Sequence, residues 1–212
     1  MRNATGANER GLHETPPVFA AFGRFRAIRV SEDGPTSQLH SEEQRVRHYC
    51  TIETRMGHVG LAARDGKLTR TTLPKRTREQ ALREIAAGLG KDAVEDEAAF
   101  GDLPSKLRRY FEGERVDLSA VKVDLSRYGT FHANVIQAAQ GIPYGRLVTY
   151  GELAKMAGSE RAARAAGSAM AGNNTPIIVP CHRVIASGGR IGGFSSGLEW
   201  KRELLRLEGV DI

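Results

Sequence analysis

The stretch Ile177-Ile178-Val179-Pro180-Cys181-His182-Arg183-Val184-Ile185 places a cysteine and a histidine between two apolar runs. Apolar neighbours on both sides predict burial, and buried polar groups are costly unless they have partners or a task. A thiol attacks only as the thiolate, and the adjacent His182 and Arg183 offer a base and a positive charge that favour that form. On residue type alone an inert buried cysteine is the simpler interpretation, because free cysteine is among the most buried residues. The neighbours reverse that preference and indicate a nucleophile.

The residues before this stretch have the spacing of helices. Three segments are expected: Phe131–Gln140, Tyr150–Ala157 and Glu160–Ala171. Ser159 is the expected N-cap of the third helix, and Gly158-Ser159 would join it to the second in a helix-turn-helix connection. The third helix carries Arg161, Arg164 and Ser168 along one side and is otherwise almost entirely alanine and glycine. A surface with so little bulk suits a DNA groove, although an ordinary packing helix with solvated arginines would have the same composition.

Earlier in the chain, alternating residues and turn signals predict a small antiparallel sheet. Its strands are expected at Tyr49–Thr54, His58–Ala63 and Leu68–Leu73, joined by turns at Met56-Gly57 and Asp65-Gly66. Helices at Thr77–Leu89 and Pro104–Glu112 and a last strand at Val121–Leu125 would follow.

The predicted fold class is therefore α+β. A flexible extension, residues 1–45, precedes a small N-terminal domain of antiparallel β-sheet and helices, residues 46–125. A helical C-terminal domain with a helix-turn-helix DNA-binding motif, residues 126–212, completes the chain.

Composition and charge favour a globular protein with an anionic partner. A chain of 212 residues, 40% of them hydrophobic, can bury a substantial core. The formal net charge is +6; residues 127–212 hold 10 Lys and Arg against 6 Asp and Glu, whereas residues 1–126 hold 21 against 19. The C-terminal part is the more basic one and is expected to bind the anion.

The sequence contains no run of about 18 apolar residues, and its first residues lack the apolar core of a signal peptide. A soluble protein without membrane contact is expected, in the cytoplasm or, in a eukaryote, the nucleus. Two cysteines are too few for a disulfide framework, and Cys50 near His48 and His58 cannot supply four thiolates to a structural zinc. Neither a metal nor a cofactor is expected.

Residues 180–184, Pro-Cys-His-Arg-Val, resemble the active-site signature of the O6-alkylguanine-DNA alkyltransferases, also called methylated-DNA–protein-cysteine methyltransferases. The signature is highly specific. The similarity covers about residues 126–209 and includes Ile142-Pro143-Tyr144-Gly145, Thr149–Ala154, Arg161–Asn173, Gly192–Gly197 and Lys201–Gly209. Residues 46–125 match only loosely, and residues 1–45 match nothing.

The resemblance implies a role for each matching residue of the reactive centre. Cys181 is the implied alkyl acceptor, His182 the base that acts through a water, and Glu208 the carboxylate that orients the histidine. Asn173 is the implied hinge asparagine, whose side chain bonds to backbone, with Asn174 as its competitor.

Further residues match the positions that meet DNA and the flipped base. Tyr150 is implied to crowd the phosphate and bond to the departing base, and Arg164 to fill the gap that the base leaves. Gly167 and Ser187 are the other implied DNA contacts. The implied base pocket consists of Val184, Phe194 and Ser195. Phe194 stands where the family often has tyrosine, and Ile136 where it often has tryptophan, so both positions stay apolar.

The implied function is direct reversal of DNA alkylation damage in a single turnover. The alkyl group of O6-alkylguanine would move irreversibly to Cys181, and O4-alkylthymine is left open as a second substrate. Because the O6 substituent of a paired guanine is out of reach of a buried thiol, the nucleotide must flip out of the duplex. The implied partner is double-stranded DNA that contains O6-alkylguanine. The protein is expected to be a monomer, with cooperative binding along DNA left open.

Three other functions are compatible with parts of the sequence. An alkyltransferase-like protein would bind lesions without transferring anything, but such relatives lack the cysteine that Cys181 provides. A cysteine hydrolase would normally have its cysteine and histidine apart in sequence. A helix-turn-helix transcription factor would leave the buried Cys-His pair unexplained. Loss of alkyl groups from DNA that depends on the thiol would discriminate among all of them.

Overall fold

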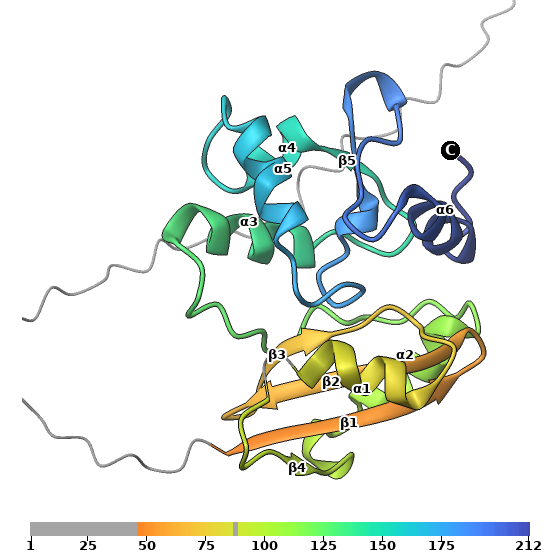
Figure 1. Cartoon of the computed structure of the whole chain (residues 1–212). Coiled ribbons are helices and arrows are strands. Elements are labelled where there is room, and N and C mark those ends of the chain that lie inside the picture. The colour runs from red at the N-terminus through yellow and green to blue at the C-terminus, as the bar shows by residue number, and fades with distance from the viewer. Residues whose placement is uncertain (1–45, 87–88) are drawn as a thin grey trace, which may run out of the picture. The chain divides into compact units, whose positions relative to one another are not determined.

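The computed structural model describes residues 46–86 and 89–212. The predicted N-terminal extension, residues 1–45, lies outside these described residues. The described part has a four-stranded sheet followed by a part rich in helices (Figure 1). No helix within it is long and apolar enough to cross a membrane. The predicted α+β class is confirmed.

The first sheet has the strand order β3-β2-β1-β4. The bounds are β1 Arg47–Thr54, β2 Gly57–Arg64, β3 Lys67–Thr71 and β4 Val94–Glu95. The first three strands form two antiparallel hairpins, whereas β4 pairs with β1 in parallel. Asp65 and Gly66 both have positive φ, 52° and 70°, as a two-residue hairpin turn requires. The three hairpin strands predicted from the sequence are confirmed.

Two predicted helices pack against this sheet. They are α1 Arg78–Ala86 and α2 Leu103–Phe111, with a short 3-10 helix η2 Ala98–Phe100 before α2. The hydroxyl of Thr77 accepts a bond from the backbone N–H of Gln80 at 3.3 Å and helps to start α1. Gly60 lets α1 approach β2 closely, because a Cβ there would lie 3.0 Å from the carbonyl oxygen of Ala81. In Figure 1, α1 lies over one face of the sheet, against β2 and β1.

The predicted last strand at Val121–Leu125 is wrong. Only Val123 makes a bridge, to Leu68, through bonds from Leu68 N to Lys122 O and from Asp124 N to Leu68 O, each 2.8 Å. The carboxylate of Asp124 then accepts from the backbone N–H of Ser126 at 2.9 Å. Such a local side-chain turn competes with strand pairing and ends the extended segment after one bridge.

The C-terminal part is mainly but not entirely helical. Its helices are α3 Thr130–Gln140, α4 Tyr150–Met156, α5 Ala163–Ala171 and α6 Leu198–Leu207, with 3-10 turns η3 Cys181–Arg183 and η4 Ser187–Gly189. A short parallel pair, β5 Val148–Thr149 with β6 Val184–Ile185, corrects the expectation of a domain without strands. Helix α6 was not predicted from its pattern.

Ser159 is not the N-cap of α5, which begins four residues later. Its backbone N–H bonds to Ala154 O at 2.9 Å, while Gly158 N bonds to Lys155 O at 3.0 Å and Gly158 has φ +89°. These two bonds with a left-handed glycine are the Schellman ending of a helix, so Ser159 completes α4 instead. Residues 157–162 connect α4 to α5, and the two helices pack side by side (Figure 1).

The stretch that contains the cysteine belongs to two apolar cores. Ile177 and Ile178 are buried with residues of β1, β2 and α2, whereas Val179, Cys181 and Val184 are buried with residues of α3, α4 and α5. The reactive segment is therefore held from both sides, by the sheet part and by the helical part of the described chain.

Candidate active site

The thiol of Cys181 lies at the start of η3, where a side-chain amide fixes its surroundings. The Asn173 side-chain N–H₂ donates to Val179 O at 2.9 Å and lies 3.2 Å from the Cys181 Sγ. Its carbonyl oxygen accepts from Thr175 N at 3.0 Å. Cys181 is only 6% exposed. Of the two neighbouring asparagines, the structure brings Asn173 and not Asn174 to the sulfur.

The residue after Cys181 is a buried histidine that pairs with a buried carboxylate. His182 is 0% exposed, and its Nε2 lies 2.7 Å from Oε1 of Glu208. The same carboxylate accepts from Arg183 Nε and Tyr110 Oη, at 2.9 and 2.8 Å, and from the backbone N–H of Gly145 at 2.9 Å. Glu208, although it comes 26 positions after His182 along the chain, is thus held by several donors.

These contacts favour one protonation state for each member of the pair. Burial tends to raise the pKa of Glu208, but hydrogen bonds from His182 and Arg183 outweigh it and hold the pKa well below its ordinary value. Burial lowers the pKa of His182 against the opposing effect of Glu208, so the imidazole is neutral near pH 7. With Nε2–H donating to the carboxylate, Nδ1 carries the lone pair. That Nδ1 is buried and has no hydrogen-bond partner among the described residues.

The positive charge that acts on the thiol comes from Lys201 rather than from Arg183. Burial raises the pKa of Cys181, while the Asn173 hydrogen bond and the charge of Lys201 act to lower it. The guanidinium of Arg183 instead donates to Glu208 and to Ile142 O. The expectation that Arg183 activates the cysteine directly is therefore corrected.

Lys201 is a functional candidate that the sequence reasoning missed. Its side chain projects from α6, is 0% exposed, and donates from Nζ to Val184 O and to Gly193 O, the latter at 3.2 Å. Burial lowers the pKa of Lys201 to about 8. The available signal was the helical spacing of Lys201 with Leu204, Leu205 and Glu208, which places a lysine on the buried side of a helix.

Three of the residues expected to meet DNA, Tyr150, Arg164 and Gly167, lie on the neighbouring helices α4 and α5. Tyr150 begins α4, is half-buried, and donates from its hydroxyl to Gly193 O at 3.2 Å. A Cβ on Gly167 would lie 3.8 Å from Cδ1 of Tyr150, so the two positions are in contact across the helices. Arg164 and Ser168 are exposed on α5, while Arg161 is exposed in the connection before it.

The expected base-pocket residues come from two segments around the thiol. Val184 is fully buried in β6, and Phe194 is half-buried between the two apolar cores. Ser195 and Ser187 are exposed, the latter in η4. Ile136 is buried in the helical core, as an apolar residue in that position should be.

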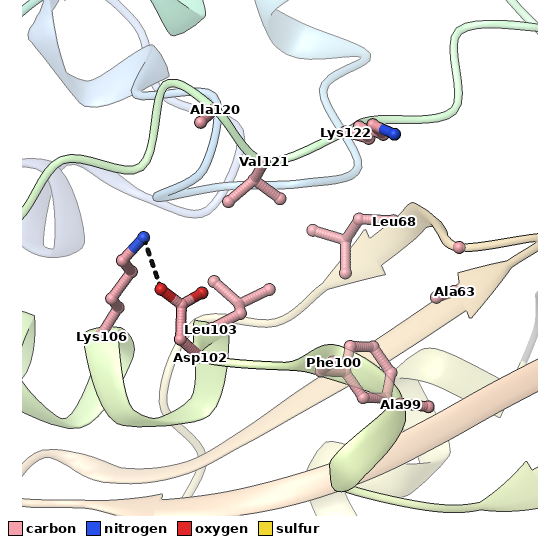
Figure 2. Close-up of a pocket in the computed structure, with 11 residues that line it drawn as sticks. Ala63, Leu68, Ala99, Phe100, Asp102, Leu103, Lys106, Ala120, Val121 and Lys122 are labelled. Carbon is pink, nitrogen blue, oxygen red and sulfur yellow. Dashed lines mark ion pairs between the residues drawn. The ribbon is translucent and has the colours of Figure 1, made fainter.

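Two surface hollows lie away from the thiol. One, of about 280 Å³, is lined by Leu68, Phe100, Leu103 and Val121 with the Lys106–Asp102 ion pair, 2.8 Å long, at its edge (Figure 2). Another, of about 470 Å³, is lined by residues 115–119, 140–144, 177–178 and Arg183. Cys181 lines neither, so the chemistry of the reactive segment and not cavity size identifies the candidate site.

The second cysteine, Cys50, lies buried in β1. Burial and the nearby carboxylates of Glu97 and Glu95 raise its pKa to about 12, which makes it a poor nucleophile. No group of three or more His, Cys, Asp or Glu side chains within residues 46–86 and 89–212 could hold a metal ion.

Comparison with known proteins gives matches over most of the described chain. A family model for the DNA binding domain of 6-O-methylguanine DNA methyltransferase matches residues 130–210, and one for its ribonuclease-like domain matches residues 48–125. The methylated-DNA–protein-cysteine methyltransferase of Mycolicibacterium paratuberculosis is 37% identical over 160 residues, 76% of this chain and 91% of the relative. That of Methanosarcina acetivorans is 46% identical over 117 residues, 55% and 73% of the two chains.

A solved structure agrees with these matches. The crystal structure of Mycobacterium tuberculosis OGT in complex with DNA has a TM-score of 0.59 and 36% identity, and the match covers 76% of this chain and 93% of that one. Family models and relatives thus span both the sheet part and the helical part. The chain belongs to the 6-O-methylguanine DNA methyltransferase family.

Proposed function

We propose that this chain repairs DNA by transferring the alkyl group of O6-alkylguanine to the sulfur of Cys181, once per molecule. The observation that carries the proposal is the buried series Cys181, His182 and Glu208, in which an ionised carboxylate fixes the neutral imidazole of the residue that follows the cysteine. Relatives named as methylated-DNA–protein-cysteine methyltransferases support the same reaction.

The reaction needs a proton removed from the thiol, one displacement, and a proton supplied to the released base. The thiol proton passes to Nδ1 of His182 through a water, because Nε2 is already committed to Glu208. The thiolate then attacks the alkyl carbon, forming the carbon–sulfur bond while the bond from that carbon to the guanine O6 breaks. The electron pair leaves with the guanine oxygen, and the base takes up a proton in place of the alkyl group, which restores guanine. Glu208 stabilises the imidazolium until it returns its proton. The hydroxyl of Tyr150, which donates to Gly193 O in this structure, would instead bond to the departing base.

Self-inactivation follows from the product. The acceptor sulfur becomes a thioether, which is neither a thiolate nor a good leaving group, so no second alkyl group can be accepted. No step in this sequence requires a metal or a cofactor. Turnover should therefore stop after one equivalent of lesion.

The partner in this proposal is double-stranded DNA. The solved complex of a related protein with DNA supports this partner. The exposed side of α5 supports it as well, because Arg164 is surrounded there by small residues. Arg164 would enter the duplex in place of the flipped nucleotide, with Gly167 and Ser187 near the strand. Residues 126–212 would bind DNA and accept the alkyl group as a monomer, and residues 46–125 would support them.

Intact mass spectrometry tests the proposal. The protein is mixed with a duplex that bears one O6-methylguanine, beside a Cys181→Ala control. We expect the mass of one methyl group to be added to the wild type and nothing to the control. An unchanged mass together with tight binding to the lesion would show instead a protein that binds damage without repairing it.

A further inference from the structure

The segment that leads to Cys181 contains a strained residue. Ile177 has φ +74° and is 1% exposed. A positive φ is unfavourable for a β-branched residue and persists only where the surrounding structure enforces it. The other non-glycine residue with positive φ among those described, Asp65, lies in a hairpin turn where that conformation is ordinary. Ile177 also lies in a tight turn, between the bridged residues Pro176 and Val179, but unlike aspartate it is β-branched and rarely adopts this conformation.

Contacts within the segment provide part of the enforcement. Val179 N donates to Thr175 O at 2.9 Å, which closes the backbone around Pro176 and Ile177. The side chain of Ile177 is buried with residues of the sheet. These contacts bend the chain, but they do not connect its backbone to the sheet.

The last residue of β3 makes that connection. The backbone N–H of Thr71 donates to Asn174 O at 3.0 Å, and its hydroxyl donates to Pro176 O at 2.8 Å. Thr71 is 3% exposed, so the donor side of both bonds is buried. The two carbonyls that it holds flank Thr175 and come immediately after Asn173 and before Ile177.

We propose that Thr71 is a positioning residue for the alkyl acceptor, a role that rests on the proposed function of Cys181. Its hydroxyl fixes the carbonyl of Pro176 and so keeps Ile177 in its strained conformation. That conformation leaves the Asn173 amide directed at both Val179 O and the thiol sulfur. Thr71 touches neither sulfur nor DNA, and it acts through the backbone of residues 174–179.

A purely structural threonine would give different results. If the hydroxyl of Thr71 only satisfied a buried carbonyl, its loss would lower stability without changing the reactivity of folded molecules. A positioning role instead lowers the transfer rate at saturating DNA and leaves DNA affinity unchanged. Restoring a hydroxyl with serine should restore the rate.

The experiment compares single-turnover methyl transfer and duplex affinity in wild type, Thr71→Val and Thr71→Ser. The matched control is Thr69→Val, because the hydroxyl of Thr69 on the same strand donates to Ala62 O at 3.1 Å within the sheet. For Thr71→Val we expect the saturated rate to fall about tenfold, since one buried acceptor is left unpaired. Affinity for DNA should stay within about twofold, and Thr71→Ser and the control should both react like the wild type.

Each other outcome has a distinct meaning. A wild type that transfers no methyl group would overturn the proposed function itself. A wild type that reacts normally, with Thr71→Val equally fast or with Thr71→Ser equally slow, would overturn the role of the Thr71 hydroxyl alone. If Thr71→Val does not fold, Thr71→Ala removes the same hydroxyl with less bulk, and a wild-type rate in its folded molecules would overturn the role as well.

Discussion

At the scale of single residues, the carboxylate of Glu208 organises the candidate site. It accepts hydrogen bonds from His182, Arg183, Tyr110 and the backbone of Gly145, all of them short. Because Arg183 compensates much of its charge, the carboxylate can stay ionised beside a neutral histidine. The histidine is thereby fixed in one tautomer without being charged before the reaction begins.

Replacing Glu208 by Gln should impair both activity and stability. We expect the transfer rate to fall by about two orders of magnitude, because the imidazolium loses its partner. The free energy of unfolding near pH 7 should drop by about 3 kcal/mol, because Arg183 would be left buried without its counter-ion. Single-turnover kinetics and urea unfolding measure the two effects. A variant as active as the wild type would contradict the role given to the carboxylate.

The stability difference should depend on pH in a defined direction. The folded-state pKa of Glu208 lies well below its ordinary value of 4.5, so the stabilisation is present above that ordinary value and is lost as pH falls through the folded-state pKa. Unfolding of wild type and Glu208→Gln should therefore differ most near neutral pH and converge in acid. A difference that grew in acid would have the wrong sign.

Replacing Lys201 by Met should make the thiol less reactive. The charge of Lys201 acts to lower the pKa of Cys181, so its removal should slow the reaction of Cys181 with iodoacetamide by about tenfold near pH 7. Because the pKa of Lys201 is about 8, the advantage of the wild type should shrink above that pH. Peptide mapping of alkylated Cys181 measures the reaction rate near pH 7 and its change with pH. The control Lys155→Met alters an exposed lysine on α4 and should change nothing; a wild-type rate in Lys201→Met would refute the charge effect.

At the scale of elements, the patterns that depend on nearby residues were predicted best. The hairpins and helices α1 to α4 follow from alternation, turn residues and helical spacing in short windows. The ends of elements that depend on competing local bonds were predicted wrongly. The side-chain turn at Asp124 limits the expected last strand to one bridge, and the left-handed Gly158 makes Ser159 part of the ending of α4. Helix α6 was not predicted because its buried face contains Lys201, and lysine counts as an exposed residue when apolar periodicity is assessed.

The Schellman ending of α4 predicts a specific cost for one substitution. Gly158 has φ +89° and open space around its Cα, so Gly158→Ala should lower the free energy of unfolding by about 1 kcal/mol through backbone strain alone. Gly141, which ends α3 with φ −77°, is the matched control and should tolerate alanine. Urea unfolding of both variants tests this, and equal stabilities would argue against the assigned ending.

The exposed side of α5 leads to a prediction about DNA. If Arg164 fills the gap left by a flipped nucleotide, Arg164→Ala should slow repair of a duplex lesion much more than repair of the same lesion in single-stranded DNA. The reason is that an unpaired base requires no replacement in the stack. Arg202→Ala, an exposed arginine on α6, is the control. Equal slowing on both substrates would exclude the insertion role.

At the scale of the whole described molecule, the reactive segment lies where two cores meet. Residues 177–178 are buried with the sheet and residues 179–184 with the helices, so neither part alone shapes the site. The sequence resemblance supplied Cys181, His182, Glu208 and Asn173, since those residues follow a recognisable motif. Lys201 and Thr71 could not be found in that way, because their contacts depend on how distant segments pack.

The measurement that tests the central claim most directly is the location of the transferred group. The protein is reacted with a duplex bearing O6-trideuteromethylguanine, digested, and analysed by tandem mass spectrometry. The expected result is one trideuteromethyl group on the sulfur of Cys181 and none on the buried Cys50. Label on any other residue, or unlabelled Cys181 with an intact lesion, would contradict the account.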